Sequence, residues 1–149
     1  MLRRIPVLLV AMAAIGLWGC GTDRHSASGF RLPPDGNAER GKAAFLAFGC
    51  QNCHAVVGAD LPRPTIQPPV PVVLGGTVNQ PVADGYLVTS IVNPSYSLAR
   101  YPAAQITAGG RSRMPHYADR MTVAQLADLV EFLQEHYSVR PTTPAFPYN

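Results

Sequence analysis

The chain has 149 residues, with 12 Lys and Arg and 9 Asp and Glu, which gives a formal net charge of +3 at pH 7. This length suits one small domain with extensions at its ends. Three cysteines cannot supply the two cysteine pairs of a structural zinc site. The Ser, His and Asp residues form no nucleophile motif and no glycine-rich phosphate loop is present, so these classes of enzyme are not indicated.

Residues 1–19 have the pattern of a secretory signal peptide. Two arginines precede an apolar run over residues 5–18, which is too short for a secure transmembrane span. The run ends in Leu-Trp-Gly-Cys at residues 17–20, which resembles a bacterial lipobox and implies cleavage before Cys20 and lipid attachment to its sulfur. An uncleaved anchor helix and an ordinary secretory signal are the alternatives. All three predict an exported protein, and the lipobox predicts a membrane-anchored lipoprotein that faces the periplasm.

The basic character of the chain comes largely from this segment. Removal of residues 1–19 lowers the count of Lys and Arg from 12 to 10 against 9 acidic residues, which leaves a net charge of +1. The sequence pI of about 9.0 is therefore no argument for nucleic acid or for an anionic partner.

Composition divides the remainder into three parts. Residues 20–36 are small and polar and end in Pro33-Pro34, which predicts a tether from the lipid to the domain. Residues 37–137 form the single folded domain, and residues 138–149 predict an extended, proline-containing tail.

The first helix is expected from Asn37 to Phe48. Asn37 is a good N-cap, and Gly49 ends the helix. Gly41 lies on the same face as Phe45 and would allow a second helix to approach closely there.

The motif Cys-Gln-Asn-Cys-His follows at residues 50–54. C-x-x-C-H is the attachment signature of a c-type haem. Cys50 and Cys53 can each form a thioether with one vinyl group of the same porphyrin, and His54 can then offer a nitrogen to the iron. Cys20 takes the lipid in this interpretation, so no cysteine remains for a disulfide. A redox role of the thiols without haem is a distant alternative.

Prolines dominate residues 56–81, which predicts a long loop around the cofactor. Within it, residues 70–74 would line the ring, and a short edge strand over the same residues is the alternative. A second short helix is expected from Asp84, as its cap, to Val92, because Asn93-Pro94 stops it. Residues 95–120 are predicted to be irregular.

The last helix has the clearest local signals. Thr122 is its N-cap and Gln125 completes a capping box, while Met121 and Leu126 form a hydrophobic staple. An apolar face follows at helical spacing, and polar residues occupy the rest of the surface. The apolar residues are Leu126, Leu129, Val130, Leu133 and Tyr137, and the polar residues are Asp128, Glu131, Gln134 and Glu135.

A haem iron with six ligands needs a second axial residue besides His54. Met114 is favoured because it lies in a loop, precedes a proline and is far enough along the chain to reach the opposite face of the ring. His116 is the rival in the same loop, and Met121 is assigned to the staple. His25 in the tether and His136 on the last helix are expected to be solvent-exposed.

These features together resemble the class I c-type cytochromes, over about Ala38 to Tyr137. The resemblance implies an all-α fold of three main helices, with long irregular loops around one covalent haem. It implies that the first and last helices cross near Gly41 and Phe45, against Leu129, Phe132 or Leu133. It also implies that a proline carbonyl, from Pro62, Pro64 or Pro68, accepts the proton of His54. Arg111 and Arg113 are candidates for pairing with a haem propionate, and solvation of both side chains is the alternative.

The expected function is electron transfer between a dehydrogenase or cytochrome donor and an oxidase or reductase, through one haem c with His54 and Met114 as ligands. No enzyme activity, small-molecule substrate or nucleic acid is expected. Apolar residues from Ile66 to Leu74 would form the docking rim for transient redox partners. The alternatives are a permanent haem subunit of a periplasmic oxidoreductase and a haem-based ligand sensor in which Met114 yields to a diatomic ligand.

Overall fold

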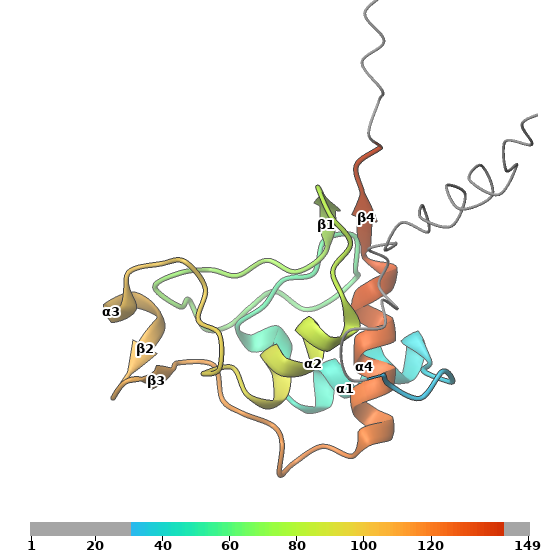
Figure 1. Cartoon of the computed structure of the whole chain (residues 1–149), viewed down its shortest axis with the longest axis horizontal. Helices are drawn as coiled ribbons and strands as arrows, with labels where there is room; N and C mark the ends of the chain where they lie inside the picture. The colour runs from blue at the N-terminus through green and yellow to red at the C-terminus, as the bar shows by residue number, and fades with distance from the viewer. Residues whose placement is uncertain (1–30, 142–149) are drawn as a thin grey trace, which may run out of the picture.

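The computed structural model describes residues 31–141, and three helices joined by long loops dominate it (Figure 1). These helices are α1 (Ala38–Ala47), α2 (Asp84–Val92) and α4 (Val123–Glu135). The mostly α fold with three main helices is the predicted one. The shorter elements are η2 (Cys50–Asn52), β1 (Gly76–Val78), α3 (Ala103–Ile106), β2 (Thr107–Ala108), β3 (Arg111–Ser112) and β4 (Tyr137–Val139).

The predicted signal peptide, Cys20 and most of the predicted tether lie outside the described residues. The last part of the tether is described, and it lies against the domain. Leu32 packs against the hydrophobic core, and a Cβ on Gly36 would lie 2.9 Å from the carbonyl oxygen of Ala127 in α4. None of the helices within residues 31–141 has the length and apolarity that crossing a membrane requires.

Helix α1 forms where its capping residues predict it. The side chain of Asn37 accepts a hydrogen bond from the backbone N–H of Arg40 at 2.9 Å, which satisfies one of the free donors of the first turn. Phe48 is the C-cap, and Gly49 follows in the left-handed conformation with φ +72°. Glycine adopts this conformation without steric cost, so the chain can turn sharply out of the helix.

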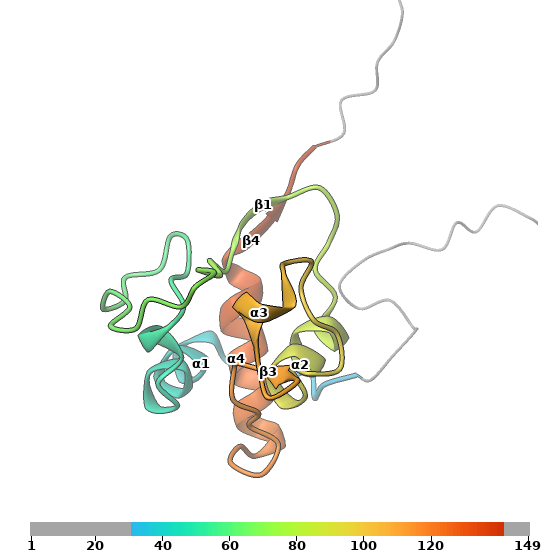
Figure 2. The same ribbon diagram turned by 90° about the vertical axis from the view of Figure 1, so that its left-hand side faces the viewer.

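Helices α1 and α4 cross at Gly41, as the sequence predicted (Figures 1 and 2). A Cβ on Gly41 would overlap the carbonyl oxygen of Asp128 and lie 2.7 Å from the Cβ of Phe132. One turn further along, the rings of Phe45 and Phe132 pack with their centroids 5.6 Å apart. Phe45 is 1% exposed, so this crossing is the centre of the core.

Asp128 lies in this crossing, whereas its assignment to the polar face of the last helix predicted exposure. Its carboxylate accepts hydrogen bonds from the backbone N–H of Asn37 at 2.8 Å and from Nε and Nη2 of Arg40 at 2.8 and 2.7 Å. The hydrogen bond from Arg40 is the largest cause that lowers the pKa of Asp128 from 3.8. A buried carboxylate with three donors is satisfied, and here it joins the start of α1 to the middle of α4.

Helix α2 covers the other side of α4. Its residues Leu87, Val88 and Ile91 are buried in the same core. Gln134, which was expected on the polar face, is buried and donates from Nε2 to the carbonyl of Val82 at 2.7 Å and to Oδ1 of Asp84 at 2.9 Å.

Two details of the predicted helix ends are corrected. Ala83 is the N-cap of α2, and Asp84 is the first residue of the helix. The Asp84 carboxylate accepts a hydrogen bond from Gln134. Helix α4 begins with the predicted capping box of Thr122 and Gln125, but it ends at Glu135 with His136 as C-cap. Tyr137 therefore belongs to β4 and not to the apolar face of the helix.

Four short strands were not predicted. β1 and β4 form a parallel pair with Gly76 opposite Tyr137 and Val78 opposite Val139, which places the start of the predicted tail in the fold. β2 and β3 form an antiparallel pair beyond α3, on the side of the molecule away from α4 (Figure 1). The alternative of a strand over residues 70–74 is wrong, because these residues form only an isolated bridge, between Val56 and Leu74.

Substitution of Gly41 tests the helix crossing. Gly41→Ala should lower the free energy of unfolding by about 1–3 kcal/mol, because the new methyl group overlaps α4. Gly85→Ala in α2 is the matched control, since nothing lies within 4 Å of a Cβ there. It should raise stability by about 0.5–1 kcal/mol through helix propensity. Urea unfolding of the haem-loaded proteins measures both, and equal stabilities would contradict the crossing.

Asp128→Asn should destabilise the fold at pH 7 in a pH-dependent way. Because folding lowers the pKa of Asp128, its ionised form stabilises the fold above the pKa of the unfolded chain. That stability is lost as the pH falls through the lower pKa of the folded state. The difference in unfolding free energy between wild type and variant should therefore shrink below about pH 4. Glu135→Gln, at an exposed position of the same helix, is the control and should show no comparable loss.

Candidate functional site

Residues 50–54 form a tight turn directly after α1. The left-handed Gly49 turns the chain out of the helix, and residues Cys50–Asn52 form a single 3-10 turn. The backbone N–H groups of Cys53 and His54 both donate to the carbonyl of Cys50, at 3.1 and 2.9 Å. Side chains three residues apart in a 3-10 turn lie on the same side, so this turn presents Cys50 and Cys53 together.

Both cysteines are free thiols and half-buried. Burial is the main cause that raises the pKa of Cys50 from 9.0 to about 11. A thiol with this pKa stays protonated at neutral pH and is a poor nucleophile, because the thiolate is the reactive form. Cys50 therefore lacks the lowered pKa of a reactive redox thiol, which disfavours that role for Cys50.

The His54 ring is oriented by a backbone carbonyl. Its Nδ1 lies 2.9 Å from the carbonyl oxygen of Val72. A carbonyl can only accept, so Nδ1 carries the proton and Nε2 is left as the nitrogen with a free lone pair. The acceptor is thus the residue after Pro71, and none of Pro62, Pro64 and Pro68 has the role that was predicted for one of them.

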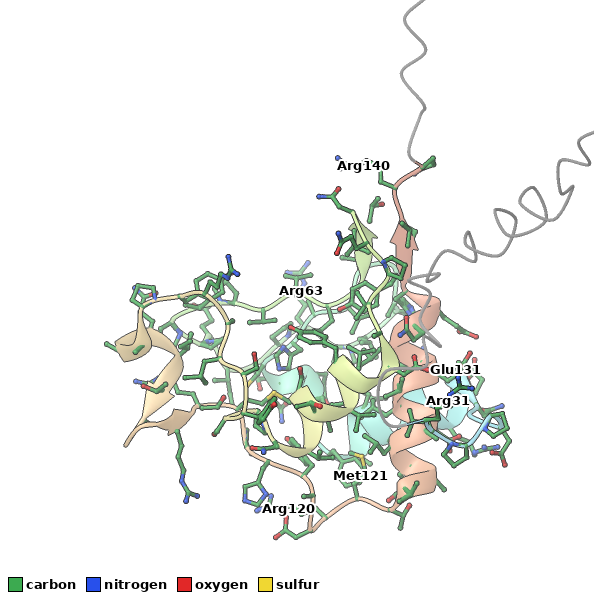
Figure 3. All side chains as sticks on the ribbon, viewed as in Figure 1. Arg31, Arg63, Arg120, Met121, Glu131 and Arg140 are labelled. Carbon is green, nitrogen blue, oxygen red and sulfur yellow. The ribbon has the colours of Figure 1, made fainter. Side chains whose placement is uncertain are left out.

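The loop between His54 and Val72 is tied to the attachment turn at a second point. The backbone N–H of Ile66 donates to the carbonyl of Asn52 at 2.7 Å, and the hydroxyl of Thr65 donates to the Asn52 side chain at 3.2 Å. Arg63 lies on this loop (Figure 3). The predicted proline-rich loop therefore folds back over the turn that carries the cysteines.

The segment with Met114 reaches the same region from the other end of the chain. Met114 and Cys50 are half-buried and pack against the same hydrophobic core. Tyr117, three residues beyond Met114, packs edge to face on Phe48 with the ring centroids 5.9 Å apart. Burial is the main cause that raises the pKa of Tyr117, and the nearby Cys50 and Cys53 also raise it. Tyr117 therefore brings the Met114 loop to the attachment turn.

A pocket of about 440 Å³ lies beside Met114, between the end of α2 and the segment after β3. Neither the cysteines nor His54 line it. Arg111 lines this pocket, whereas the Arg113 side chain donates to the carbonyl of Ala104 at 3.4 Å. Of the two arginines expected near a propionate, Arg111 is the one beside this pocket. The residues that line the pocket are Val92, Asn93, Pro94, Ser95, Arg111, Ser112, Met114, Pro115 and His116.

The other candidate ligands have different surroundings. His116 is exposed, with Nδ1 3.7 Å from Oδ1 of Asp119. Met121 packs against the core at the start of α4, as a staple residue would (Figure 3). His136 was expected in solvent, but it is half-buried, with Nδ1 2.9 Å from the carbonyl of Phe132 and its ring 4.8 Å from the Phe132 ring. His25 lies outside the described residues.

Three helices with long loops, and a turn with two free thiols next to an oriented histidine, define a protein that holds a haem covalently. A family model described as Cytochrome c matches residues 38–136. The chain therefore belongs to the cytochrome c family, whose members bind haem and transfer electrons. The comparisons with curated proteins and with solved structures found no match.

The cofactor of this family is haem c, attached through Cys50 and Cys53, and the donor set fits it. Two free thiols on one side of a turn are available for thioethers. His54 has its proton on Nδ1, which leaves Nε2 for a metal. No group of three or more His, Cys, Asp or Glu residues in residues 31–141 is arranged to hold a metal ion, so no competing site is found there.

Two contributors to the site were not predicted. The carbonyl of Val72 leaves no signature in the sequence, because every residue has a carbonyl and the fold decides which one reaches His54. Tyr117 was also missed, although an aromatic residue three positions after the candidate ligand Met114 is a signal that could have pointed to it.

Proposed function

We propose that this chain is an exported, membrane-anchored electron carrier with one haem c, whose iron is bound by His54 and Met114. The hydrogen bond from Nδ1 of His54 to the carbonyl of Val72 carries the proposal, because it fixes the tautomer in which Nε2 has a free lone pair for the iron. The half-buried Met114, which packs against the same core as Cys50, supports a thioether as the second ligand.

Held by Cys50, Cys53 and His54, a haem would supply one-electron chemistry, and the protein residues around it would set its reduction potential. The Val72 carbonyl increases the electron density of the imidazole, which favours ferric iron. A methionine thioether favours ferrous iron and raises the reduction potential relative to two histidines. If His54 and Met114 both bind the iron, no ligand position would remain for a substrate, which supports the role of a carrier.

Export and anchoring rest on residues 1–20, which lie outside the described residues. The basic start, the apolar run and Cys20 support cleavage before Cys20 and lipid attachment to its sulfur. The folded domain would then face the periplasm on a tether whose last residues pack against α4. The domain would meet its electron donor and acceptor at the membrane surface.

Spectra of two methionine variants test the ligand set. Protein matured in a host with haem-attachment machinery should show, when oxidised, the weak far-red band of a sulfur–iron bond. Met114→Ala should abolish this band and lower the reduction potential. Met121→Ala is the matched control, since Met121 is also half-buried against the core, and it should keep the band. Survival of the band in Met114→Ala, or its loss only in Met121→Ala, would contradict the proposal.

The docking rim of the proposed carrier lies on the loop that holds His54. Ile66, Val72 and Val73 are 54, 39 and 58% exposed, and all three belong to this one loop. Redox partners form small and transient interfaces, and exposed apolar residues suit them. Val72 is unsuited to a test of docking, because its carbonyl is the partner of His54.

Val73→Asp should slow electron exchange with the native membranes of the source cell by at least about fivefold, the equivalent of about 1 kcal/mol. Val123→Asp is the control, because Val123 is 55% exposed at the start of α4, away from the rim. Exchange with ferricyanide, a small oxidant that needs no apolar contact, should be similar in all three proteins. Unchanged exchange of Val73→Asp with the membranes would show that docking occurs elsewhere.

A further inference from the structure

The carbonyl that orients His54 belongs to a segment with few attachments of its own. Residues 67–73 contain three prolines, which have no backbone N–H to donate. Within the described chain, these seven residues make no backbone-to-backbone hydrogen bond. The backbone hydrogen bonds nearest to Val72 along the chain are therefore those of Leu74 and β1, which follow it.

Leu74 is the first of them, and it is bonded to the strand-like segment after His54. Its N–H donates to the carbonyl of Ala55 at 2.9 Å, and its carbonyl accepts from the N–H of Val57 at 2.9 Å. These two bonds place the chain before Leu74 beside the chain after His54, at the register in which Val72 meets Nδ1.

β1 follows directly and pairs with β4 at the end of α4 (Figures 1 and 2). The N–H of Gly76 donates to the carbonyl of His136 at 2.7 Å, and the N–H of Arg140 donates to the carbonyl of Val78 at 2.8 Å. The hydroxyls of Thr77 and Ser138 lie 3.1 Å apart on the same pair. This pairing joins the loop around His54 to the helix that packs in the core.

The close contact between the start of β1 and the end of α4 leaves no room for a side chain at Gly75. Its φ is +77°, and a Cβ would lie 2.9 Å from the carbonyl oxygen and 3.1 Å from the Cβ of His136. His136 cannot yield easily, since its ring packs on Phe132 and its Nδ1 lies 2.9 Å from the carbonyl of Phe132. The glycine thus allows β1 to lie directly against the end of α4.

We infer that the β1–β4 pair is a positioning clamp for the axial histidine. The clamp, defined as residues 75–78 with residues 136–140, holds the Val72 carbonyl against Nδ1 of His54 and so sets the electron donation of the imidazole. Gly75 is a positioning residue that acts through this carbonyl and touches neither iron nor haem. The inference rests on the proposed function, in which His54 binds the iron.

The consequence for electron transfer has a definite sign. A carbonyl that accepts from Nδ1 makes the imidazole a stronger donor at Nε2 and stabilises ferric iron relative to ferrous iron. Loosening of the clamp lengthens this hydrogen bond, so it weakens that donation. The reduction potential should therefore rise, and the Nδ1 proton should exchange with solvent more rapidly.

Gly75→Ala tests the clamp, with Gly58→Ala as a matched control. Gly58 has the same φ of +77°, but a Cβ there would make only an ordinary contact of 3.9 Å with Cδ2 of His136. Both variants carry the same backbone strain, and only Gly75→Ala pushes β1 from β4. In the reduced, diamagnetic holoprotein, exchange of the His54 Nδ1 proton should be about tenfold faster in Gly75→Ala than in Gly58→Ala, which converts to about 1.4 kcal/mol. Its potential should be the higher of the two.

A second pair of variants covers the case in which Gly75→Ala does not fold. Arg140→Pro removes the N–H that donates to Val78, and Arg140→Ala keeps it. The proline variant should show the faster exchange and the higher potential, by a smaller margin.

The outcomes separate the two proposals. A wild-type spectrum without a His/Met iron overturns the proposed function, whatever the variants show. A wild-type spectrum with a His/Met iron, together with equal exchange rates and potentials within each folded pair of variants, overturns the clamp. Faster exchange and a higher potential in Gly75→Ala or Arg140→Pro than in the matched control support it, because a merely structural role would move unfolding alone.

Discussion

Because Gly41 has no side chain, α1 and α4 cross at backbone distance. This contact fixes the relative position of the two helices, and each helix leads to a segment that contacts His54. Helix α1 ends at Gly49 and delivers the turn with Cys50 and Cys53. Helix α4 ends at His136, β4 pairs with β1, and the chain before β1 carries the Val72 carbonyl. Both segments contact His54. The turn after α1 carries its backbone, and the chain before β1 binds its Nδ1 through the Val72 carbonyl. A Cβ at Gly41 would overlap α4, so a larger residue there would shift the crossing. Such a shift would move the turn after α1 and the chain before β1 relative to each other.

Few hydrogen bonds hold the loops around the site. A covalent cofactor explains why few are needed. A domain of about one hundred residues buries a modest apolar core of its own, so a porphyrin held by Cys50 and Cys53 supplies much of the apolar area that the loops cover. Prolines reduce the entropy that these loops lose on folding. The hydrogen bonds of Asn52 with residues 65–66, and those of Leu74, are then enough to fix the path of the first loop.

Local signals predicted the helices and the attachment motif, because each depends on neighbouring residues. The residues that begin and end the helices bond within one turn of the backbone, so the sequence shows them directly. They are Asn37, Gly49, Thr122 and Gln125. Contacts between distant residues were not predictable in this way. Asp128 meets Arg40 across 88 residues, and Thr77 meets Ser138 across 61. The same holds for Val72, whose carbonyl is chosen by the register of Leu74 and β1 and not by its side chain.

In the proposed carrier, the loop from Ile66 to Leu74 would serve two tasks, which use different parts of its residues. Docking depends on exposed side chains, such as those of Ile66 and Val73, whereas the orientation of His54 depends on a backbone carbonyl. A side-chain substitution at Ile66 or Val73 therefore leaves the acceptor in place, and a substitution at Gly75 leaves the identity of the rim side chains unchanged. Partner recognition and reduction potential can consequently vary independently, although they reside in the same nine residues. This separation follows from the clamp, since backbone hydrogen bonds of Leu74, β1 and β4 hold the loop without any contribution from the rim side chains.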